Sequence, residues 1–121
     1  MPLIALLIDD SMLIRHTVGR FLEARGFSVE TATDGAAALE TLKTIRPDII
    51  FTDLKMPRLD GYALIDALKA NPETARIPVL VLAAKPPSGD VKETGAHSII
   101  YKDLNVEAQI VQALESLFPS S

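Results

Sequence analysis

Short apolar runs alternate with segments of helical periodicity along the chain. Residues 3–8 are almost entirely apolar and stop abruptly at two Asp residues, a pattern that predicts a buried strand. In the next segment, apolar residues recur at positions 14, 18, 21 and 22, which is the spacing of an amphipathic helix. Ser11 can cap the beginning of this helix, and Gly26 is placed to end it.

The same alternation continues to the end of the chain. Further strands are predicted at residues 27–32, 48–52, 79–83 and 99–101. Further helices are predicted after Asp34, Asp60 and Asn105, because these side chains can accept hydrogen bonds from the free N–H groups of a first helical turn. The second helix should stop before Pro47, and the third should close at Asn71.

One place in the repeat is weak. The run Pro86-Pro87-Ser88-Gly89 falls where a fourth helix should begin, and at most one or two turns could fit between Asp90 and Thr94. The strand–helix alternation nevertheless predicts an α/β fold. We expect a doubly wound, five-stranded parallel sheet of flavodoxin-like order 2-1-3-4-5, with a short or missing fourth helix.

Composition narrows the class of protein. The 121 residues fit one domain, residues 1–121, and the 48% of hydrophobic residues suffices for a core. The net charge of −4 argues against a nucleic-acid partner, and the absence of Cys excludes disulfides, thiolate metal sites and Cys nucleophiles. Neither a signal peptide nor an apolar run near the roughly 18 residues of a membrane span is present, so we expect a cytoplasmic protein with no membrane partner.

Charged residues collect where the predicted strands end. Asp9 and Asp10 follow the first strand, Asp53 follows the third, and Lys102 follows the fifth. In the predicted order, strands one and three are neighbours at the point where ligands bind, so three carboxylates should meet there. Crowded carboxylates need a cation, and an oxygen-only ligand set favours Mg²⁺. An Asp held between Mg²⁺ and a Lys is suited to take up a phosphoryl group.

Over essentially its full length, the chain resembles the receiver domains of bacterial response regulators, the chemotaxis-type receivers of two-component systems. The matching motifs are Asp9-Asp10-Ser11, Asp53-Leu54-Lys55-Met56-Pro57 followed by Asp60-Gly61, Ile77-Pro78-Val79, Gly95-Ala96 and Lys102. The stretch from Asp53 to Gly61, at this place in a strand–helix repeat, is the most specific of them.

The resemblance implies a role for each matching residue. Asp53 would be the phosphoacceptor, and Lys102 would bind the phosphoryl oxygens. Asp10 would bind Mg²⁺ directly, Asp9 would bind it through water, and the carbonyl of Lys55 would be a third protein ligand. The resemblance also implies a signalling module that is not an enzyme. Its phosphodonor would be a histidine kinase or a phosphotransfer protein, and its output a downstream protein partner.

Three positions depart from the family. Ala83 stands at the end of the fourth strand, where the family has Thr or Ser, and Ile99 stands where it often has Tyr or Phe. We place the nearest ring, that of Tyr101, on the opposite side of the strand from Ile99. Asp103 replaces the Pro that usually follows the Lys. The lost hydroxyl and the short or missing fourth helix favour an alternative, a pseudo-receiver that binds partners without phosphorylation, whereas the intact acidic site opposes it.

Other interpretations are weaker. Asp9 or Asp10 could simply cap the first helix, and Lys102 could be an ordinary surface residue. A phosphatase of the haloacid dehalogenase type would need a second Asp two residues after the nucleophile, where Lys55 stands. A flavodoxin would need a phosphate-binding loop after the first strand, where Asp9 and Asp10 would repel the FMN phosphate.

Overall fold

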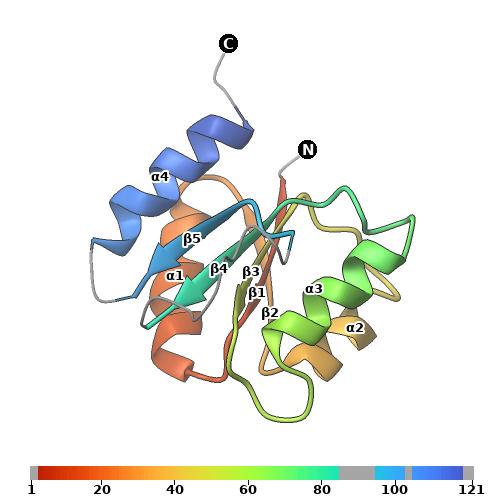
Figure 1. Cartoon of the computed structure of the whole chain (residues 1–121). Coiled ribbons are helices and arrows are strands. Elements are labelled where there is room, and N and C mark those ends of the chain that lie inside the picture. The colour runs from red at the N-terminus through yellow and green to blue at the C-terminus, as the bar shows by residue number, and fades with distance from the viewer. Residues whose placement is uncertain (1–2, 85–94, 103–104, 119–121) are drawn as a thin grey trace.

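A five-stranded parallel sheet forms the centre of the molecule (Figure 1). The computed structural model describes residues 3–84, 95–102 and 105–118. The strands lie in the order β2-β1-β3-β4-β5, as predicted. Their bounds are β1 Ile4–Ile8, β2 Ser28–Ala32, β3 Ile49–Asp53, β4 Val79–Ala83 and β5 Ser98–Tyr101. The helices are α1 Met12–Ala24, α2 Gly35–Thr41, α3 Gly61–Ala70 and α4 Val106–Leu117.

Helices cover both faces of the sheet. Figure 1 shows α1 and α4 on one face and α2 and α3 on the other. Successive side chains of β1 therefore enter different cores: Ala5 and Leu7 pack on the α1/α4 side, and Leu6 and Ile8 on the α2/α3 side. Burial on both faces explains why this strand reads as a continuous apolar run. The predicted fold class is confirmed.

The side chains predicted to cap helices do so. Each accepts a hydrogen bond from a main-chain N–H three residues later, which satisfies a group that the first helical turn leaves free. The pairs are Ser11 Oγ with Ile14 N at 3.3 Å, Asp34 Oδ1 with Ala37 N at 2.8 Å, Asp60 Oδ1 with Ala63 N at 2.9 Å, and Asn105 Oδ1 with Ala108 N at 3.2 Å. Beyond the other end of α1, Gly26 adopts a φ of 96°, as expected of a helix-ending glycine.

Two expectations have different outcomes. The short or missing fourth helix falls on residues 85–94, which lie outside the described residues.

The expected placement of Tyr101 was wrong. Ile99 packs on the α2/α3 side and Ile100 on the α1/α4 side. Because strand side chains alternate with a period of two, residue 101 shares the face of Ile99.

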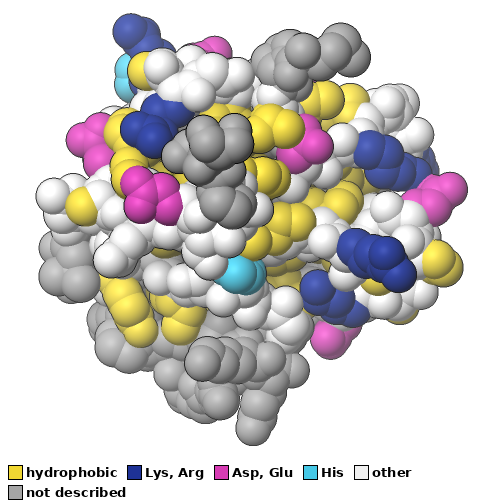
Figure 2. Space-filling model, turned by 90° about the horizontal axis from the view of Figure 1, so that it is seen from above, with side chains coloured by type: hydrophobic (Ala, Val, Ile, Leu, Met, Phe, Trp, Pro, Cys, Tyr) yellow, Lys and Arg dark blue, Asp and Glu magenta, His cyan; other side chains and the backbone are white. Residues whose placement is uncertain are grey.

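The two ends of the sheet differ in character. Figure 2 views the molecule from above Figure 1, at the end where the strands begin, and there Lys and Arg side chains are interspersed with Asp and Glu. Asp9, Asp10 and Asp53 lie at the opposite end, at the carboxyl ends of the strands. Among the described residues, no helix combines the length and apolar character needed to cross a membrane.

Candidate functional site

Three carboxylates meet at the carboxyl end of the sheet. Because Ile8 is paired with Thr52 across β1 and β3, the residues that follow them, Asp9 and Asp53, emerge side by side. One oxygen of Asp9, one of Asp10 and one of Asp53 all lie within 4.8 Å of one another. The neighbouring positions of β1 and β3 thus bring together the acidic residues singled out in the sequence.

Asp9 is the most constrained of the three. Its side chain is fully buried, and Oδ1 accepts a hydrogen bond of 2.9 Å from the main-chain N–H of Ser11. Lys102 Nζ lies 2.8 Å from Oδ2, yet Oδ2 accepts no hydrogen bond with good geometry from the described residues. The short distance identifies an ion pair, and Oδ2 keeps a lone pair available to a further cation.

Asp53 is held on both oxygens. Oδ1 accepts a hydrogen bond of 2.8 Å from the N–H of Leu54, and Oδ2 accepts one of 3.1 Å from Lys102 Nζ. The Lys102 side chain is only 17% exposed, so its ammonium sits between two carboxylates rather than in bulk water. This geometry argues against the view of Lys102 as an ordinary surface lysine.

The other predicted site residues lie at the rim. Asp10 is exposed, with one carboxylate oxygen in the cluster. Lys55 has an exposed side chain in the loop two residues beyond Asp53. The group expected to bind metal there is its main-chain carbonyl, and this assignment stays a prediction.

The electrostatics of the cluster are unbalanced. Burial raises the pKa of Asp9, and the negative charge of Asp53 adds to the rise; the Lys102 ammonium and the Ser11 N–H oppose it without cancelling it. For Lys102, burial alone would lower the pKa, but the contacts with Asp9 and Asp53 outweigh burial and raise it. One ammonium therefore cannot fully compensate the three carboxylates.

The donor set fits a small hard cation. All three side chains offer oxygen, which Mg²⁺ prefers, and the buried Oδ2 of Asp9 has unused acceptor capacity. The three oxygens lie within 4.8 Å of one another, which is close enough for one small cation to lie among them.

Arg15, which no sequence motif had singled out, supports the first acidic loop. Arg15 Nη1 donates a hydrogen bond of 2.7 Å to the main-chain carbonyl of Asp9. The N–H of Asp9 donates to the carbonyl of Ala32 at 3.1 Å. Both main-chain groups of Asp9 are therefore held, which fixes the direction of its buried carboxylate.

A second arginine braces the loop after Asp53. Arg58 Nε donates to Asp34 Oδ2 at 2.8 Å, and Nη2 of the same side chain lies 2.6 Å from that oxygen. Arg58 is the one non-glycine residue among those described with a positive φ, 67°. The N–H of Gly35 also donates to the carbonyl of Leu59 at 3.0 Å. The loops before α2 and α3 are thus bound to each other.

Gly61 brings the start of α3 against Asp53. Its N–H donates to the carbonyl of Leu54 at 2.9 Å. A Cβ at position 61 would lie 2.8 Å from the Cα of Leu54 and even nearer to the carbonyl oxygen of Asp53. A side chain at this position would therefore push α3 away from Asp53.

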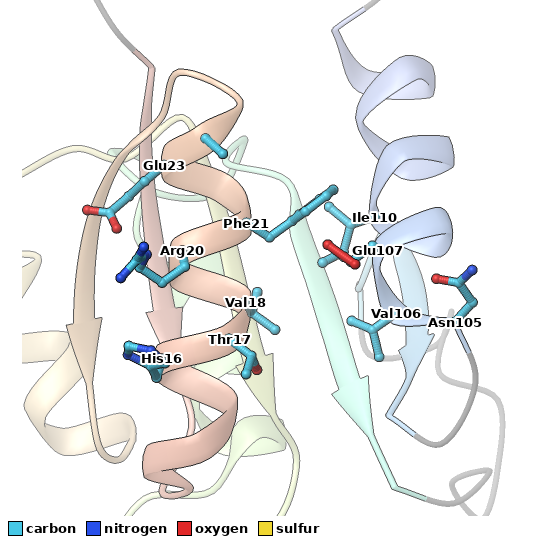
Figure 3. A pocket seen from close by; sticks show the side chains of 11 residues that line it. His16, Thr17, Val18, Arg20, Phe21, Glu23, Asn105, Val106, Glu107 and Ile110 are labelled. Carbon is cyan, nitrogen blue, oxygen red and sulfur yellow. The ribbon is translucent and has the colours of Figure 1, made fainter.

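A separate groove lies between α1 and α4 (Figure 3). It has a volume of about 1050 Å³, and its lining includes Phe21 from α1 and Val106 and Ile110 from α4. None of the three carboxylates lines it, so this groove is distinct from the acidic cluster. The charged residues of its lining are of both signs, Arg20, Glu23 and Glu107, rather than a cluster of carboxylates.

Comparison with known proteins places the chain in a family. The sequence model of a family described as the response regulator receiver domain matches residues 5–115. The chain is 40% identical over 116 residues to a gliding motility regulatory protein of Myxococcus xanthus, which covers 93% of this chain and 15% of that protein. It is 39% identical over 85 residues to the response regulator MprA of a Mycobacterium species, which covers 70% of this chain and 36% of that protein. The chain thus spans only a minor part of the length of either relative.

A solved structure agrees in fold. The chemotaxis response regulator CheY4 of Vibrio cholerae superposes with a TM-score of 0.88 at 28% sequence identity. The superposition covers 98% of this chain and 100% of that chain. The similarity therefore extends over the whole sheet and its helices.

The raised pKa of Asp9 leads to a prediction about stability. A carboxyl whose pKa is higher in the folded state adds stability below its unfolded pKa and loses it as the pH rises through the folded value. At pH 7 the charged form is therefore unfavourable, and Asp9→Asn should raise the free energy of unfolding of the metal-free protein. The gain should disappear below about pH 4.

Urea unfolding at pH 7 and below about pH 4, with a chelator present, measures the free energy of unfolding of both proteins. Asp66→Asn is the matched control, because Asp66 is exposed on α3 and its replacement should change little. Loss of stability at pH 7 in Asp9→Asn would show that the ion pair with Lys102 outweighs the cost of burial.

Proposed function

The chain belongs to the family of response regulator receiver domains, and from this premise we propose that it is a signalling module that accepts a phosphoryl group on Asp53. The observation that carries the proposal is the bridging position of Lys102 Nζ, 2.8 Å from Asp9 and 3.1 Å from Asp53. This arrangement places a nucleophilic carboxylate beside a cation and an acidic cluster that fits a second cation. Residues 1–121 would form one such domain.

The proposed reaction is transfer of a phosphoryl group from a donor to the Asp53 carboxylate. An oxygen of Asp53 attacks the phosphorus atom and forms a new P–O bond, which gives an aspartyl phosphate. The bond between phosphorus and the donor breaks, and the leaving group departs with its electron pair. The N–H of Leu54 holds one carboxylate oxygen and so fixes the direction of attack.

Mg²⁺ is the cofactor that we propose for this site. Asp10 would bind the ion directly, Asp9 through water, and Asp53 and the carbonyl of Lys55 would complete the protein ligands. When bound, the ion neutralises negative charge on the transferring phosphoryl group. The support in this chain is the oxygen cluster and the unused acceptor capacity of Asp9 Oδ2.

Lys102 is proposed to bind the phosphoryl oxygens. Its ammonium contacts the carboxylates of Asp9 and Asp53. A phosphoryl group on Asp53 would bring new anionic oxygens within reach of the same ammonium, where charge-assisted hydrogen bonds are strong. Lys102 therefore needs to stay near its present position throughout the reaction.

Partners follow from this chemistry. Receiver domains are signalling modules rather than classical enzymes, and they work with histidine kinases or phosphotransfer proteins and with downstream partners. For this chain, we propose a phosphohistidine as the donor and a protein as the downstream partner. The cytoplasmic location and the absence of nucleic-acid and membrane partners stay predictions from the sequence.

A second candidate function, the pseudo-receiver, is favoured by one observation. Ala83 is the last residue of β4, is buried, and offers no hydroxyl group at the place where the family usually has one. Its carbonyl accepts a hydrogen bond of 2.8 Å from the N–H of Lys102, so it lies directly beside the site. Phosphorylation could then occur without a change of the partner surface.

Binding of Mg²⁺ should stabilise the folded protein. An ion that binds only the folded state at 100 times its dissociation constant stabilises that state by about 2.7 kcal/mol. The melting temperature should therefore rise with millimolar Mg²⁺, and the rise should shrink in Asp10→Asn but not in Asp66→Asn. Differential scanning calorimetry measures the melting temperature of all three proteins with and without Mg²⁺. An unchanged wild-type melting temperature would remove Mg²⁺ from the proposal.

The phosphoacceptor is tested with a small donor. Acetyl phosphate with Mg²⁺ should add one phosphoryl group to the wild-type protein, detected by intact-protein mass spectrometry. Asp53→Asn should abolish the addition because it removes the nucleophile. Lys102→Ala should slow the addition and leave the stabilisation by Mg²⁺ in place. A hydroxylamine-sensitive adduct that persists in Asp53→Asn would place the acceptor elsewhere.

The pseudo-receiver candidate is tested by the response to a phosphoryl mimic. Beryllofluoride should shift amide resonances near Asp10, Asp53 and Lys102, with only small shifts across residues 95–101, because the Ala83 side chain has no hydroxyl group to donate a hydrogen bond. Ala83→Thr should enlarge the response, since a hydrogen bond to a charged group is worth about 1.5–3 kcal/mol. Large shifts across residues 95–101 in the wild-type protein would instead favour a functional switch.

A further inference from the structure

The side chain of Gln109 makes an unusual contact with β5. Its Oε1 accepts a hydrogen bond of 2.8 Å from the N–H of Tyr101, and its Nε2 donates one of 2.9 Å to the carbonyl of the same residue. Nε2 also lies 3.3 Å from the carbonyl of Asn105, which accepts a further hydrogen bond. The carboxamide therefore satisfies both main-chain groups of one strand residue at once, and its own orientation is fixed by acceptor and donor contacts together.

The position of Tyr101 explains why this contact is possible. β5 is the outermost strand of the sheet, so one side of its main chain faces away from β4. The N–H of Lys102 points inward and donates to Ala83. The N–H and carbonyl of the preceding residue point outward, where a neighbouring strand would otherwise pair with them. Gln109 takes the place of such a strand at this single position.

The contact lies next to Lys102, the residue proposed to bind the phosphoryl oxygens. Tyr101 directly precedes Lys102, and Asn105 follows three residues later, so Gln109 holds the main chain on both sides of residues 102–104. In the family a Pro usually follows the Lys and restricts the main chain there, whereas this chain has Asp103. The Gln109 carboxamide supplies a restriction of a different kind.

We propose that Gln109 is a positioning residue for Lys102, acting through the main chain of Tyr101. Lys has a long, flexible side chain, so its ammonium stays between Asp9 and Asp53 only if its main chain is fixed. Small displacements of a group that contacts the reacting atoms can cost about a hundredfold in rate. This inference rests on the proposed function, because the reaction served is phosphoryl transfer to Asp53.

Apolar residues other than Gln109 pack α4 on the rest of the domain. Figure 3 shows Val106 and Ile110 directed from α4 toward the α1 side, and Ile110 is fully buried in that core. Gln109 lies on another side of the helix, toward β5, and is only half-buried. Its replacement should therefore leave the helix docked, which separates a positioning role from a general structural one.

The test is the rate of phosphorylation by acetyl phosphate in a set of variants. Gln109→Met keeps the length of the side chain but removes all three hydrogen bonds, and we expect it to slow the reaction about tenfold. The control is Gln112→Ala, an exposed glutamine on the same helix, which should react at the wild-type rate. The stabilisation of each variant by Mg²⁺ should match that of the wild-type protein.

A double-mutant cycle identifies the residue through which Gln109 acts. In a Lys102→Ala background, Gln109→Met should cause no further loss, because the group that it positions is gone. An equal loss in both backgrounds would overturn the inference, and so would a wild-type rate for Gln109→Met. Gln109→Glu should also be slow, since a carboxylate cannot donate to the Tyr101 carbonyl.

Hydrogen exchange, combined with the phosphorylation assay, distinguishes the two proposals. Hydrogen exchange of the Tyr101 amide should be slow in the wild-type protein and faster in Gln109→Met. If wild-type protein with a protected Tyr101 amide takes up no phosphoryl group, the proposed function fails, and the role of Gln109 in that reaction fails with it. If phosphorylation is normal in both proteins, the proposed function stands and only the inference about Gln109 is overturned.

Discussion

The organisation of this domain depends on the burial of one negatively charged group beside another. Asp9 is fully buried at the end of β1, next to Asp53 at the end of β3, and the ammonium of Lys102 is shared between them. Such an arrangement is unfavourable, and it persists because the surrounding main chain keeps the two carboxylates close while the Lys102 ammonium offsets part of their repulsion. The pairing of β1 with β3 supplies that restraint, and the Arg15 contact with the Asp9 carbonyl adds to it.

Much of this arrangement is predictable because the signals for it are local. A capping side chain and the N–H that it satisfies are three residues apart, so Ser11 and Asn105 could be identified from the sequence alone. The fully apolar runs indicated strands buried on both faces, and from the strand order the meeting of Asp9 with Asp53 followed directly. The acidic cluster is therefore a consequence of topology as much as of motif.

The contacts that escaped prediction join residues distant along the chain or depend on side-chain direction. The pair formed by Arg58 and Asp34 is separated by 24 residues, and no pattern of hydrophobicity indicates it. The contact of Gln109 with Tyr101 depends on the direction in which the Gln109 side chain leaves α4, and the predicted strand order does not give that direction. The wrong placement of Tyr101 relative to Ile99 had another cause. The period of two in a strand already puts residues 99 and 101 on the same face, and it was not applied correctly.

The close approach at two glycines has a consequence for how this sequence can change. A Cβ at position 35 would lie 2.5 Å from the carbonyl oxygen of Leu59, and one at position 61 would meet the main chain of Asp53 and Leu54. Neither glycine offers a functional group, yet both should be among the least replaceable residues. Random mutagenesis would thus find positions that do not tolerate substitution over a wider region than the acidic cluster itself. At the edge of this region, Gly35 and Gly61 would tolerate no substitution because the fold has no room there for a side chain.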